Sequence, residues 1–166
     1  MADTKELDPA IKKEADQVFR AICDTLDADE INYNRFDADY HLDFYWLSDD
    51  LDIRIDVQMW PQSYQVSFAS VMPYCLTGKN RAKIATALNE INKQFLLGFM
   101  LMDEQTGRVR YMVSQSYNGS MLGQGAYRKL LQCCFDAADE YNEKLFLYDR
   151  DMITYEQLFA EDNKED

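Results

Sequence analysis

The sequence predicts an α+β fold in which helices pack on one face of an antiparallel β-sheet. Residues 53–60 alternate strictly between apolar and polar side chains, which is typical of an antiparallel strand with one packed and one wetter face. Residues 9–27 and 81–95 instead repeat apolar side chains every three or four positions, the period of a helix with one buried stripe. Residues 80–117 contain a helix, a strand, a tight turn and a second strand in direct succession.

The first helix is expected from Pro9 to about Asp27. Asp8 is a suitable N-cap, and proline is favoured at the first helical position because its missing N–H is not needed there. Strands are then expected over 31–36 (short and polar), 41–47, 51–60 and 63–72, separated by turns at 48–50 and 61–62.

The central unit begins at Asn80, a favourable N-cap whose side chain can accept from the free amides of the next turn. Gly98 is expected to stop this helix, because glycine adopts the left-handed conformation without a Cβ penalty. A strand over 99–102, a hairpin loop over 103–107 and a strand over 108–114 follow.

The last long helix is expected over 126–143, after a glycine-rich connection. The tail beyond it is acidic and contains one possible short helix that starts at Thr154. We therefore expect one domain over residues 1–166, with a core of about 9–147, a tail over 148–166 and the element order α-β-β-β-α-β-β-α.

Residues 87–92, Gly98-Phe99, Asp103-Glu104 and 106–110 carry a resemblance to the YbjN family of bacterial sensory-transduction regulators. Members of that family have a fold similar to the chaperones of type III secretion systems. The resemblance implies a helix, three antiparallel strands, a helix, two strands and a final helix over roughly residues 9–147. It also implies a regulatory or interaction module, and it transfers no catalytic residues.

The net charge is −13 and is unevenly distributed. Residues 1–50 hold fourteen acidic and five basic side chains, residues 51–135 five and nine, and residues 136–166 eleven and three. A surface this negative repels phosphate, so binding to nucleic acid is not expected.

No apolar run is long enough for a signal peptide or a membrane span, so we expect a cytoplasmic protein that makes no membrane contact. The cysteines Cys23, Cys75, Cys133 and Cys134 lack the spacing of metal ligands and are expected as thiols. We expect neither a metal nor a cofactor.

For catalysis, the single histidine, His41, has Asp43 two residues further along its strand and therefore on the same face. No nucleophile or second acid completes a site around this pair, so the sequence does not predict an enzyme. The alternative is a small enzyme or ligand-binding domain with a pocket between sheet and helices near His41.

The side of the sheet that should be wet carries unexpected apolar and arginine side chains. Methionine and tryptophan make adaptable apolar surfaces, and arginine is favoured at interfaces. We therefore predict a non-catalytic module that binds a segment of a partner protein on this side, which can also pair with an open strand edge. The predicted partner-binding residues are Trp60, Val71, Met100, Met102, Arg108, Arg110 and Met112. The alternatives are that the first strand, the tail or the partner of a homodimer covers these residues.

Overall fold

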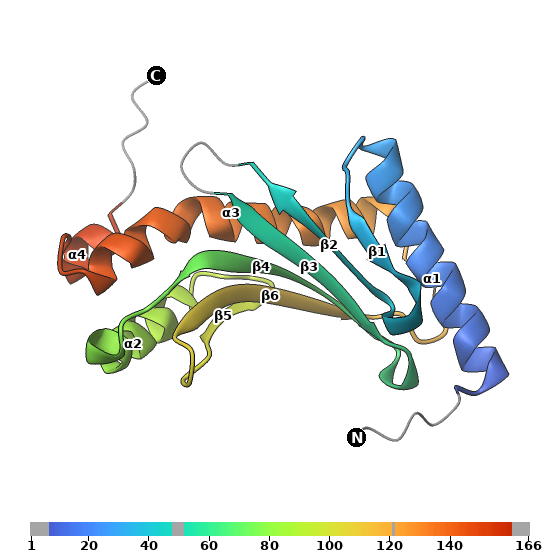
Figure 1. The fold of residues 1–166 in the computed structure, drawn as a ribbon, viewed down its shortest axis with the longest axis horizontal. Coiled ribbons are helices and arrows are strands. Elements are labelled where there is room, and N and C mark those ends of the chain that lie inside the picture. Colours follow the sequence, from blue (N-terminus) through green and yellow to red (C-terminus); the bar gives the residue numbers. More distant parts are fainter. Residues whose placement is uncertain (1–6, 48–51, 121, 161–166) are drawn as a thin grey trace.

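The computed structural model describes residues 7–47, 52–120 and 122–160. One sheet forms its centre, and the helices lie against one face of that sheet (Figure 1). The predicted turn at 48–50 lies outside the described residues.

The helices are α1 (Pro9–Ala28), α2 (Arg81–Ile91), α3 (Gln124–Asp149) and α4 (Tyr155–Leu158). The long α3 runs along the sheet, while α1 and α2 lie at opposite ends of the molecule (Figure 1). No helix in this part of the chain is both long enough and apolar enough to cross a bilayer.

The strands are β1 (Asn34–Phe36), β2 (His41–Trp46), β3 (Ile53–Trp60), β4 (Gln65–Cys75), β5 (Phe99–Met102) and β6 (Arg108–Ser116). They form a single sheet in the order β1-β2-β3-β4-β6-β5, and each neighbouring pair is antiparallel. The predicted α+β class with an antiparallel sheet is confirmed. The predicted order also holds, and the short strand expected over 31–36 and the short helix expected at Thr154 are present as β1 and α4.

The core lies between the sheet and α3. Phe68 of β4 is fully buried, and its ring lies 6.5 Å from that of Tyr127 on α3. At the β2 end, Trp46 stacks on Phe135 of α3 with ring centroids 4.0 Å apart. The alternating apolar residues of β3 therefore face α3, and the intervening residues face away from it.

The start and end of α2 differ from the prediction. The Asn80 side chain does not cap the helix but donates to the backbone carbonyl of Asp149. The helix also ends at Ile91 rather than near Gly98, because the Asn92 side chain bonds to the backbone of Met100 and turns the chain early. Gly98 still has a positive φ of 73°, but in the connection to β5.

The C-terminal part packs more extensively than expected. The helix α3 continues six residues beyond the predicted Glu143 and ends at Asp149. The predicted short helix at Thr154 is confirmed as α4, where Thr154 and Gln157 form a capping box. Leu158 of α4 is fully buried, so this part of the tail belongs to the packed structure.

Candidate functional site

The candidate site is the face of the sheet that points away from the helices, which we call the open face. Cross-strand pairs place on it a row formed by Tyr45, Arg54, Val71, Arg110 and Leu101. A second row contains Asp43, Asp56, Ala69, Met112 and Phe99. Directly paired residues of an antiparallel sheet share one face, so these ten side chains lie together.

Five of the seven predicted partner-binding residues lie on this face. Val71 and Met112 are half-buried, and Arg108 and Arg110 are exposed. Trp60 is 47% exposed and belongs to the same face, because it follows Arg54, Asp56 and Gln58 at alternate positions of β3.

Met100 and Met102 do not lie there, and their predicted position was wrong. Met100 pairs with Tyr111 and Met102 with Val109, both of which point toward the helices. Met100 is accordingly 2% exposed. The strand β5 consists of four apolar residues, so its sequence contains no alternation that could show which two face inward.

The open face also carries aromatic residues that the sequence analysis missed. Phe99 takes the position expected of a methionine, since it pairs with Met112 and is 43% exposed. Phe36 and Tyr45 are exposed at the β1–β2 end of the face. The sequence held a signal for Tyr45, which stands four residues after His41 and therefore on the same face of β2. Phe36 shares that face through its pairing with His41, which depends on the strand register.

The predicted residues do not form one compact patch. Trp60 and Arg54 are six residues apart on β3, a separation of roughly 20 Å along an extended strand. Val71, Arg110 and Met112 lie beside the Arg54 end of β3, whereas Trp60 ends β3 and is followed by the turn over 61–63 that contacts α1. The face therefore has two apolar ends.

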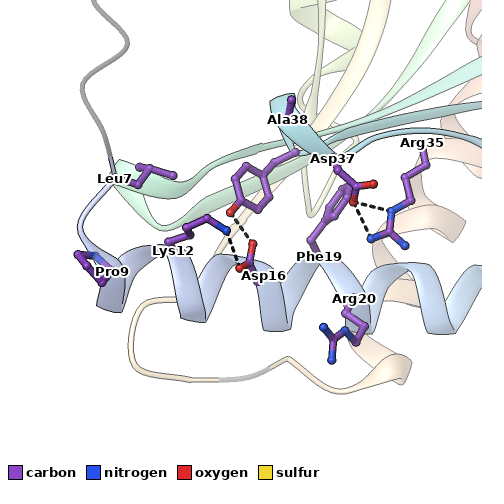
Figure 2. A pocket seen from close by; sticks show the side chains of 10 residues that line it. Leu7, Pro9, Lys12, Asp16, Phe19, Arg20, Arg35, Asp37 and Ala38 are labelled. Carbon is purple, nitrogen blue, oxygen red and sulfur yellow. Dashed lines mark hydrogen bonds and ion pairs between the residues drawn. The ribbon is translucent and has the colours of Figure 1, made fainter.

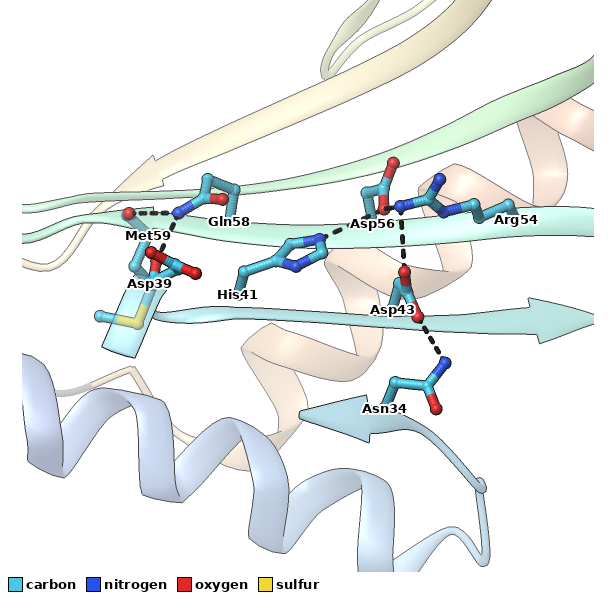
Figure 3. Close-up of polar contacts among 8 residues, drawn as sticks. All are labelled: Asn34, Asp39, His41, Asp43, Arg54, Asp56, Gln58 and Met59. Carbon is cyan, nitrogen blue, oxygen red and sulfur yellow. Dashed lines mark hydrogen bonds and ion pairs between the residues drawn. The ribbon is translucent and has the colours of Figure 1, made fainter. Parts of the chain in front are cut away.

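A polar cluster occupies the open face on β1, β2 and β3 (Figure 3). Asp43 and Asp56 are direct cross-strand partners, and the Arg54 guanidinium bridges their carboxylates at 2.9 and 2.8 Å. The Asn34 amide donates to Asp43 at 2.8 Å. Two carboxylates facing each other repel, and Arg54 offsets that repulsion.

His41 belongs to this cluster and not to a pocket between sheet and helices. Its Nε2 atom lies 3.3 Å from an Asp56 oxygen, and its ring stacks on Phe36 at 5.2 Å. The expected partner, Asp43, bonds to Arg54 and Asn34 instead. Sequence proximity therefore suggested the wrong carboxylate.

The ligating atoms of His41, Asp43 and Asp56 lie within 4.8 Å of one another, a donor set that could in principle hold a metal ion. Arg54 already pairs with an oxygen of each carboxylate, so a metal ion would have to displace it. The cluster is thus a polar network in which one guanidinium offsets part of the charge of two carboxylates.

A cavity of about 580 Å³ lies between α1 and the connection from β1 to β2 (Figure 2). Within it, Asp16 accepts hydrogen bonds from the Tyr40 hydroxyl at 2.6 Å and from Lys12 at 2.9 Å. These two donors hold the pKa of the Asp16 carboxyl below its usual value of 3.8. Arg35 pairs with Asp37 at 2.6 Å. Most charged groups of this cavity are therefore already bonded to each other.

A second cavity, of about 410 Å³, lies between residues 94–97 and α3. Leu96 and Leu97 at its rim are 96% and 47% exposed. Leu96 is thus the most exposed large apolar side chain outside the open face among the described residues.

No protein-family model matches the sequence, and no curated protein is significantly similar to it. Solved structures are similar in fold. The HopA1–SchA chaperone–effector complex contains a chain with 12% identity and a TM-score of 0.57, covering 82% of this chain and 98% of its own length. A chain of the ExsC–ExsE complex matches with 13% identity and a TM-score of 0.54, over 79% of this chain and 95% of its own.

The fold is type III secretion chaperone-like. YbjN from E. coli is also among the similar structures, with 15% identity, a TM-score of 0.49 and coverage of 80% of this chain and 91% of its own. The predicted fold is confirmed by the two matches with the higher TM-scores.

Proposed function

We propose that this protein is a non-catalytic interaction module that binds a segment of a partner protein on the open face of its sheet. The proposed contact residues are Trp60, Val71, Arg108, Arg110 and Met112, with Phe99 and Leu101 in place of Met100 and Met102. The observation that carries the proposal is an uncovered sheet face with exposed apolar side chains, in a fold that a chaperone–effector complex shares.

The chemistry of the face supports binding rather than catalysis. Its one histidine is stacked on Phe36 and contacts a carboxylate that also pairs with Arg54. The exposed aromatic rings at both ends instead offer contact area, and aromatic and arginine side chains are enriched where proteins bind one another.

The proposal is tested by a pull-down from host extract that compares the wild-type chain with Met112→Asp and Asn89→Asp. Both substitutions introduce one carboxylate, but Met112 lies on the open face beside Phe99, whereas Asn89 is exposed on α2. We expect a protein retained by wild type and Asn89→Asp and lost by Met112→Asp, with the thermal transition of all three chains nearly unchanged. Equal retention by all three would overturn the proposal.

The homodimer alternative makes a different prediction. If self-association covers the open face, light scattering of the wild type gives a dimer and Met112→Asp gives a monomer, without any other protein. The exposed Leu96 and Leu97 offer a separate self-association surface, which Leu96→Asp would disrupt and Met112→Asp would not.

A further inference from the structure

Two arginines at the α2 end of the open face form no ion pair among the described residues, although Arg110 interacts electrostatically with the Asp103 carboxylate, whose pKa hydrogen bonds from Thr106 mainly lower. Arg108 and Arg110 are exposed, and neither lies within ion-pair distance of a carboxylate among the described residues. The chain holds 30 acidic against 17 basic side chains, and Arg54 on the same face bonds to two carboxylates. Positive charge is therefore available at this end of the face.

The surroundings of these arginines are apolar. Arg110 pairs across the strands with Val71 on one side and Leu101 on the other. Met112, two residues further along β6, pairs with Ala69 and Phe99. We call Val71, Phe99, Leu101, Arg108, Arg110 and Met112 the arginine end of the open face.

In the same cross-strand rows, β2 and β3 offer no comparable free positive charge. Asp43 and Asp56 share the single guanidinium of Arg54, and His41 also contacts Asp56. A charged ligand on this face therefore meets two arginines without an ion pair on β6, and carboxylates already bonded to Arg54 on β2 and β3. A guanidinium favours a carboxylate, which it can bind through two parallel hydrogen bonds.

We infer that the arginine end binds an extended segment that presents carboxylates and apolar side chains on one side. Side chains at alternate positions of an extended chain are about 7 Å apart, the same spacing as Arg108, Arg110 and Met112 along β6. A segment with acidic, acidic and apolar residues at alternate positions matches that row. This inference rests on the proposed function and specifies the partner's chemistry.

Three labelled synthetic peptides with serine spacers test the inference by fluorescence anisotropy. One presents glutamate, glutamate and leucine at successive alternate positions, one replaces both glutamates by lysine, and one replaces leucine by serine. The wild-type chain should bind the leucine–glutamate peptide at least about tenfold more tightly than either other peptide, and more weakly as salt is added.

Charge reversal supplies the decisive comparison. Arg108→Glu combined with Arg110→Glu should weaken binding of the leucine–glutamate peptide by about tenfold and improve binding of the lysine peptide. Lys13→Glu combined with Arg20→Glu is the matched control, because it changes the net charge equally at two exposed residues of α1. This control should alter both affinities by less than about threefold.

Several outcomes would overturn the inference. These are a preference of the wild type for the lysine peptide, equal affinity for both leucine peptides, no binding of any peptide, or equal effects of the two double variants. If the wild type bound both leucine peptides equally and Met112→Asp abolished that binding, the inference would be overturned. The proposed function would still stand. The pull-down with Met112→Asp tests the proposed function independently of peptide charge.

Discussion

Asp149, at the end of α3, accepts hydrogen bonds from both the backbone N–H and the side-chain hydroxyl of Thr77, each at 3.1 Å. The Asp149 side chain is fully buried, and Thr77 lies between β4 and α2. The Asn80 side chain donates to the backbone carbonyl of the same aspartate. The end of α3 therefore holds the start of α2 in place.

Asp149→Ala should reduce the free energy of unfolding by about 2 kcal/mol, because it removes the acceptor of two charge-assisted hydrogen bonds in a buried position. Urea denaturation measures this change. Asp139→Ala, at an exposed position of α3, is the control and should change the stability by less than about 0.5 kcal/mol. Equal effects of the two substitutions would show that Asp149 does not hold this junction.

Asn92 closes one edge of the sheet. Its amide donates to the Met100 carbonyl at 2.9 Å and accepts from the Met100 N–H at 2.6 Å, on the side of β5 that has no neighbouring strand. An unpaired edge is a template for pairing with another chain. Asn92→Ala should therefore cost about 2 kcal/mol and cause concentration-dependent association.

Denaturation and light scattering check this prediction, with Asn89→Ala as the control. Asn89 is an exposed residue on α2, so its replacement should change neither the stability nor the association of the chain. If Asn92→Ala associates no more than the control, the edge does not depend on the asparagine.

Asp16 should make the free energy of unfolding depend on pH. Hydrogen bonds from Tyr40 and then Lys12 hold the pKa of Asp16 below 3.8 in the folded chain. The stabilisation is therefore present above about pH 4 and is lost as the pH falls through the folded pKa. The stability difference between wild type and Asp16→Asn should be constant from pH 7 to 5 and should shrink below pH 3.8. Urea denaturation as a function of pH gives this difference, and one that grows on acidification would contradict the assigned hydrogen bonds.

The sequence allowed prediction of those features that depend on local chemistry. The alternation of β3, the hairpin between β5 and β6 and the start of α4 at Thr154 were all predicted, because each depends on side chains close in the chain. The position of Gly98 in the left-handed conformation was predicted for the same reason.

Features that depend on distant contacts were not predicted. Asn80 bonds to Asp149 instead of capping its own helix, and Asn92 ends α2 early through Met100. For the candidate site, the parity of β5 is set by its pairing with β6, which placed Phe99 and not Met100 beside Met112. His41 likewise contacts Asp56 across the strands rather than Asp43 on its own strand.

The most direct test of the central claim is photo-crosslinking in living host cells. A photoreactive amino acid at position 112 reports contacts of the open face, and one at position 89, exposed on α2, is the control. We predict a crosslinked protein from position 112 that is not obtained from position 89. The same products from both positions, or only a product of two copies of this chain, would contradict the claim that the open face binds a partner protein.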